Sequence, residues 1–254
     1  MPQGAPGPRP RPIGLADLVD SLAEGRRTFA AARGLSLGYG AVFALIGLAI
    51  LYAIETALVT PMALPAAGGF MLVGPALLAG FFRIAERLET GEIPTVADLA
   101  DGFRRCPRGI WVIAVFCAFI FLVWITDAAT LYAFMVGRMP APLAALLPPP
   151  DSVWSFALWS SVMGSVLAFA IFAVSAYSVP LLFEGRADLI PAVAASVRAV
   201  FASPVAAIAW ALSLAVGVMG AILLLPLFPV VFPVLAFASR ALYRRVFPAG
   251  EWQG

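Results

Sequence analysis

Two residue types are missing from this 254-residue chain: it has no histidine, and all sixteen of its basic residues are arginine, so lysine is missing as well. Histidine is the usual general base, the commonest metal ligand and the usual axial ligand of haem. No serine or cysteine has a visible activating base, and no glycine-rich phosphate loop occurs. We therefore expect no haem, copper or other metal cofactor, and a protein that is not an enzyme.

Cysteine and charge are scarce. The two cysteines, Cys106 and Cys117, lie at a basic boundary and inside an apolar run, so we expect structural roles rather than a disulfide or a metal pair. Charged residues make up 12% of the chain, against about a quarter in soluble domains. The net charge is +2 and the arginines occur in short scattered clusters, which argues against nucleic acid as a partner.

Hydrophobic residues, in contrast, make up 62% of the chain. A bilayer core of about 30 Å needs roughly 20 apolar helical residues. Runs of suitable length cover residues 34–59, 65–85, 109–136, 154–182, 204–225 and 226–242. The pattern predicts an all-α polytopic membrane protein with six transmembrane helices in contact with membrane lipids. Because Pro226, Pro229 and Pro233 interrupt the last run, we expect that helix to be kinked or to start late.

The distribution of arginine predicts the orientation. Fifteen arginines fall before the first run, between the second and third, between the fourth and fifth, or near the end of the chain, and only Arg138 falls on the other side. Positively charged loops stay in the cytoplasm. We expect both termini on the cytoplasmic side of a bacterial inner membrane. Residues 14–246 form the predicted membrane domain, between a disordered proline-rich tip (1–13) and a short tail (247–254).

A polar motif recurs before the membrane runs. The stretch IPTVADLADGFRR at residues 93–105 has an apolar stripe at helical spacing, which is typical of an amphipathic helix lying in the membrane plane. A similar stretch, IPAVAASVRAVFASP, begins at Ile190, and a looser copy begins at Leu15. We therefore predict three parallel repeats, each an in-plane helix followed by two crossing helices. Cytoplasmic linkers that drift towards a similar composition are the alternative.

Few ionisable residues lie inside the predicted spans, where they are costly and often functional. Asp127 lies about 8 Å beyond the middle of the third span, and we expect it to face the bundle interior, beside Thr130 or Tyr52. Glu55 lies near the outer end of the first span, where an interfacial carboxylate is the simpler interpretation. The spacing of Arg83, Glu86 and Arg87 predicts a local ion-pair set.

Three phrases resemble one family: GLSLGYGAVFALIG, AAGGFMLVGPALLAGFFRIAERLETGE and YSVPLLFEGRADLIPAVAASVRAVFASP are similar to bacterial integral membrane proteins of domain of unknown function 2189. The resemblance covers nearly all of the chain after the proline-rich tip. It implies a multi-spanning inner-membrane protein with no assigned activity. Some members carry the label of a cytochrome c oxidase, but the haem and copper centres of such an enzyme need histidine ligands.

Two classes of function fit these observations. The first is a non-enzymatic scaffold or accessory protein in a complex with other membrane proteins, of which a respiratory complex is one example. The second is a transporter or channel for a small solute, which the repeats, the proline-broken helices and the acid within a span favour.

Overall fold

A computed structural model of the chain describes residues 8–57, 59–63, 77–137 and 151–248. Within these ranges the protein is all-helical, as predicted. Five described segments are long and apolar enough to cross a membrane: α2 (Arg33–Thr56), α6 (Arg108–Met135), α7 with α8 (Asp151–Phe183), α10 (Pro204–Leu223), and η3 with α11 (Leu225–Val246). They match the first, third, fourth, fifth and sixth predicted spans.

The second predicted span lies partly outside the described residues. Its described part belongs to α4 (Leu78–Glu89), which packs against α2. The Tyr39 hydroxyl of α2 donates a hydrogen bond to the Leu77 carbonyl at 3.0 Å, and a Cβ on Gly80 would meet the Tyr39 ring at 2.8 Å. Residues 65–76 of this span and Arg138 lie outside the described ranges, so a sixth crossing remains a prediction.

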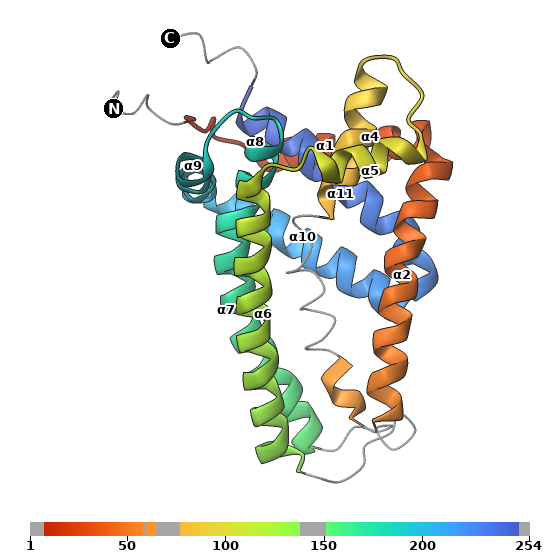
Figure 1. The fold of residues 1–254 in the computed structure, drawn as a ribbon. Helices are drawn as coiled ribbons and strands as arrows, with labels where there is room; N and C mark the ends of the chain where they lie inside the picture. Colours follow the sequence, from red (N-terminus) through yellow and green to blue (C-terminus); the bar gives the residue numbers. More distant parts are fainter. Residues whose placement is uncertain (1–7, 58, 64–76, 138–150, 249–254) are drawn as a thin grey trace.

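Figure 1 shows the arrangement of the helices. The helices α6 and α7 (Asp151–Ser175) run side by side in opposite directions, α2 stands apart from them, and α10 and α11 cross the molecule obliquely. The short helices α1 (Leu15–Ala31), α4, α5 (Val96–Arg104), α8 (Ser178–Phe183) and α9 (Leu189–Ala202) gather at one end. The described chain also begins and finishes at that end, which we call the charged end. The 3-10 turn η1 (Thr60–Met62) follows α2 at the other end.

The recurring motif forms a helix each time. α1, α5 and α9 each lead directly into a long helix, namely α2, α6 and α10. The two closer copies differ in register: Pro94 precedes Thr95, the N-cap of α5, whereas Pro191 lies inside the first turn of α9. Thr95 and Asp98 form a capping box, so α5 begins after Pro94.

Apolar residues at the starts of α5 and α9 point away from the protein. Ile93 is 89% exposed, Val96 73% and Ile190 80%. On α5 the buried positions are instead Asp98 and Gly102, which face α4, and a Cβ on Gly102 would meet the Ala79 carbonyl oxygen at 2.8 Å. An outward apolar stripe beside a polar inner face suits a helix whose outer side contacts lipid at the interface.

The last helix starts late, as predicted. The 3-10 turn η3 (Leu225–Leu227) precedes α11 (Phe228–Val246), and Pro233 lies inside α11. α11 is the central helix, because α1, α2, α4 and α10 all pack on it. α1 has the most extensive contact, and a Cβ on Gly25 would meet the Val234 carbonyl oxygen at 2.6 Å.

Both predicted terminal segments contribute to the packed structure where they are described. The Arg11 backbone N–H donates to the Val246 carbonyl at 2.9 Å, and the Ile13 N–H donates to Ser203 Oγ at 2.9 Å. Phe247 is 1% exposed and packs in the core with Tyr177 and Tyr243. The order of the chain therefore extends beyond the predicted boundaries, to Arg11 on one side and to Phe247 on the other.

Candidate functional site

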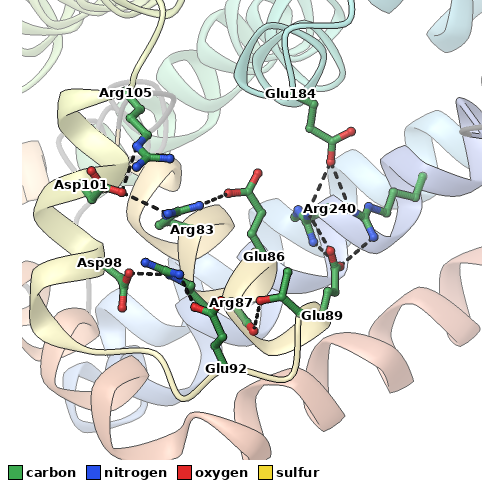
Figure 2. A network of polar contacts seen from close by, with 12 residues as sticks. Arg83, Glu86, Arg87, Glu89, Glu92, Asp98, Asp101, Arg105, Glu184 and Arg240 are labelled. Atoms are coloured by element: carbon green, nitrogen blue, oxygen red, sulfur yellow. Dashed lines mark hydrogen bonds and ion pairs between the residues drawn. The ribbon is translucent and has the colours of Figure 1, made fainter.

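The largest group of polar contacts is an arginine–carboxylate cluster at the charged end, drawn in Figure 2. Its first part joins α4 to α5. Arg83 pairs with Glu86 on its own helix at 3.0 Å and with Asp101 of α5 at 3.1 Å. Arg87 pairs with Asp98 at 2.6 Å and also contacts Glu92. The local ion-pair set is thus confirmed for Arg83 and Glu86, whereas Arg87 turns towards α5.

Asp98 is the most constrained carboxylate of this first part. It is 6% exposed and accepts hydrogen bonds from the Thr95 backbone N–H and hydroxyl, both at 2.8 Å. These bonds to Thr95, together with that from Arg87, lower the pKa of Asp98 from 3.8 to about 2. Asp98 therefore stays ionised and fixes both the start of α5 and its contact with α4.

The second part of the cluster surrounds Arg240, a residue of α11 that is only 4% exposed. Its guanidinium contacts Glu89 at the end of α4, and it reaches Glu184, just after α8, at 3.3 Å. Arg244, one turn further along α11, pairs with the same two carboxylates but is 43% exposed. Two arginines therefore connect the end of α4 to the end of α8 across α11 (Figure 2).

Arg186 extends this part to the end of the described chain. It donates to the Tyr243 hydroxyl at 3.0 Å, to the Phe247 carbonyl at 2.7 Å and to the Pro248 carbonyl at 3.0 Å. The Tyr243 hydroxyl in turn donates to Glu184 at 3.0 Å. Each of these polar groups has a partner within the protein, so the arrangement fixes helix ends rather than presenting a free acid or base.

A cavity of about 450 Å³ lies between α7, α10 and α11, with parts of α4, α6 and α8 in its wall. Its walls are mostly apolar and carry several serine hydroxyls. Ser175 lines the cavity, and its hydroxyl donates to the Ile171 carbonyl at 2.8 Å. This volume lies within the range of about 300–1,000 Å³ typical of ligand pockets.

The structure does not place Asp127 in the bundle interior, so that prediction is wrong for the single chain. Asp127 is exposed on α6, and so are its expected companions, Thr130 and Tyr52. The Thr130 hydroxyl donates instead to the Thr126 carbonyl of its own helix at 2.9 Å. α6 is apolar nearly all round, so its sequence carries no periodicity that shows which side faces the other helices.

Glu55 lies in the last turn of α2, where it accepts a hydrogen bond from the Thr60 hydroxyl of η1. This contact across the turn that follows α2 agrees with an interfacial carboxylate. Glu55 and Asp127 lie on different helices, α2 and α6.

The two cysteines are both free thiols, with Cys117 buried in α6 and Cys106 half-buried between α5 and α6. Burial raises the pKa of the Cys106 thiol, which disfavours its reactive thiolate. Within the described ranges no group of three or more cysteine, aspartate or glutamate side chains is arranged to hold a metal ion.

Apolar spans, interfacial helices and paired charges at one end together define a multi-pass, all-helical membrane protein. Residues 63–184 match a family model described as a predicted integral membrane protein, domain of unknown function 2189. The resemblance found in the sequence is thereby confirmed, although the match is narrower than the whole chain after the tip. Neither a curated protein nor a solved structure matches the chain.

Proposed function

We propose that this protein is a non-enzymatic accessory protein of a bacterial inner membrane, which docks an acidic partner protein on its charged end. One observation carries the proposal: eight exposed arginines at that end form no ion pair within the described residues. They are Arg9 and Arg11 before α1, Arg26 and Arg27 on α1, Arg33 on α2, Arg104 on α5, Arg108 on α6 and Arg198 on α9.

The carboxylates of the cluster are already paired with other arginines, which supports a role for the exposed arginines in binding a partner. Glu89, Glu184, Asp98 and Asp101 are all engaged by arginines of the cluster, which holds the ends of α4, α5, α8 and α11 together. Of the exposed arginines, Arg104 lies on α5, which the cluster holds, and Arg26 and Arg27 lie on α1, which packs along α11. A preorganised set of positive charges favours binding to a complementary acidic surface. The same bias of arginine supports a cytoplasmic location for this end and for both termini.

Recovery of partners from mild detergent tests the proposal. We expect the intact protein to retain a stoichiometric companion, identified by mass spectrometry. Recovery should fall about tenfold in a variant carrying Arg26→Glu, Arg27→Glu and Arg198→Glu, because loss of rim charges weakens electrostatic association. Asp20→Ala, which removes an exposed negative charge on α1, is the control and should not lower recovery. A protein that purifies without any stoichiometric companion contradicts docking.

Transport of a small neutral solute is a second candidate, which the cavity between α7, α10 and α11 favours. Vesicles containing only the purified protein would then pass glycerol or urea faster than empty vesicles in stopped-flow light scattering. If α7 borders the route, filling the cavity with Ala168→Leu should slow this flux. A rate equal to that of empty vesicles for both solutes speaks against the candidate.

A further inference from the structure

The cavity described above is long and narrow. Its lining includes Ser160 at one level of α7 and Ser175 at another, fifteen residues further along the same helix. At 1.5 Å per residue this interval is about 22 Å. A volume of about 450 Å³ spread over that length gives a mean cross-section of about 20 Å². This mean value is close to the cross-section of one extended hydrocarbon chain.

The walls of the cavity are neutral. None of the described residues that line it is charged, and most are aliphatic or aromatic side chains. An ionised carboxylate or phosphate inside such a site would lose its hydration without gaining a countercharge, which is strongly unfavourable. The cavity therefore selects a molecule whose enclosed part carries no charge.

The hydroxyls near the charged end favour a hydrogen-bond donor on that molecule. Ser175 ends α7, and Ser239 directly precedes Arg240 on α11. Ser175 donates its proton to the Ile171 carbonyl and Ser239 to the Leu235 carbonyl, each at 2.8 Å. The oxygen lone pairs of both serines are left to accept a hydrogen bond. A hydroxyl group on the ligand supplies the matching donor.

The cavity is also open to the side. Ser165 and Ala168 of α7 and Leu212 of α10 line it and are exposed on the apolar surface of the spans. A ligand dissolved in the bilayer can therefore reach the site without crossing water. Its chain exchanges apolar contacts with lipids for apolar contacts with the cavity walls.

From this geometry we infer that the space between α7, α10 and α11 is a binding site for a neutral, single-chain amphiphile with a hydroxyl head. The chain lies along α7, and the hydroxyl lies at the level of Ser175 and Ser239. The site is independent of docking at the exposed arginines.

Tryptophan fluorescence provides the test, because Trp124 and Trp210 both line the cavity. A protein with the other four tryptophans replaced (Trp111→Phe, Trp154→Phe, Trp159→Phe and Trp252→Phe) reports from these two positions. In vesicles, dibrominated stearyl alcohol should quench them saturably. Ala168→Leu fills the cavity and should weaken the apparent affinity about tenfold or more. Ala170→Leu, an exposed alanine of α7 outside the lining, should leave it within about twofold.

Two further probes establish the class of ligand. Dibrominated stearic acid at a pH where it is ionised should bind more weakly than the alcohol, and a dibrominated phosphatidylcholine should quench without saturation. The proposal is overturned if the alcohol fails to saturate, or if Ala168→Leu and Ala170→Leu behave alike. Equal affinity for the acid, or saturable quenching by the phospholipid, also contradicts a neutral single-chain ligand.

Discussion

At the scale of single residues, burial decides which of two neighbouring arginines matters for stability. Arg240 and Arg244 contact the same two glutamates, yet Arg240 is 4% exposed and Arg244 43%. An exposed ion pair is worth about 0–1 kcal/mol because solvent screens it. Arg240 is buried, and its hydrogen bonds to carboxylates are of the charge-assisted kind worth about 1.5–3 kcal/mol. Arg244 keeps both glutamates paired when Arg240 is removed.

We therefore expect Arg240→Ala to lower the free energy of unfolding by about 1.5–3 kcal/mol. The matched change Arg244→Ala should cost about 1 kcal/mol or less. Thermal unfolding of the purified proteins in one detergent provides the comparison. Equal losses of stability for the two variants would show that the buried position of Arg240 carries no special weight.

Asp98 gives a prediction with a defined pH range. Its pKa is lowered to about 2, so the stability that it contributes is present above its unfolded pKa, near 4, and is lost as the pH falls towards 2. Asp98→Asn removes bonds from Thr95 and Arg87, each of the charge-assisted kind worth about 1.5–3 kcal/mol. The variant should melt below the parent protein at pH 6, and the difference should shrink as the pH approaches 2.

Asp188→Asn provides the control for this measurement. Asp188 is the N-cap residue of α9, the counterpart of α5, but it is exposed and its side chain makes no capping hydrogen bond. Its replacement should change the melting temperature little at any pH. A difference for Asp98→Asn that does not depend on pH would mean that its charge is not what stabilises the start of α5.

At the scale of helices, hydropathy alone predicted the long elements within a few residues. α2, α6 and α10 begin within one residue of their predicted starts, because an arginine or a proline marks each start. The interfacial helices were also predictable from their stripe. The Arg83–Glu86 pair was predictable because residues three apart in sequence are neighbours on the surface of a helix.

Contacts between distant segments could not be predicted in this way. Arg240 and Glu89 are 151 residues apart, and no local spacing connects them. Asp127 was misplaced because α6 is apolar on every side, so its inward face follows only from how the helices pack. The cavity likewise depends on the oblique course of α10 and α11, which no short stretch of sequence encodes.

The contact between α1 and α11 supplies a prediction at this scale. A Cβ at Gly25 would lie 2.7 Å from the Ala238 backbone nitrogen, so the helices must separate to admit it. Gly25→Ala should destabilise the protein by about 1–3 kcal/mol. Gly34→Ala, at an open helical position with nothing within 4 Å, should be neutral or stabilising by up to about 1 kcal/mol. Melting temperatures that fall equally for both would contradict close packing at Gly25.

At the scale of the whole molecule, orientation is the property to test. Reporter fusions after Pro61 and after Pro149 should read periplasmic, and a fusion after Asp101 should read cytoplasmic, because fifteen arginines lie on one predicted side and Arg138 alone on the other. The end of α2 and the start of α5 lie at opposite ends of the structure, as this topology requires. A cytoplasmic signal after Pro149 would overturn it.

The packing of α1 along α11 also sets an order of events during synthesis. Some 200 residues separate the two helices in the chain, and at about 5–20 residues per second the ribosome needs on the order of ten seconds or more to make that interval. Until α11 emerges, the side of α1 that carries Ser21 and Gly25 lacks its main neighbour. α11 thus completes the packing of α1. A nascent protein stalled before α11 would expose this surface of α1 to the cell's proteases.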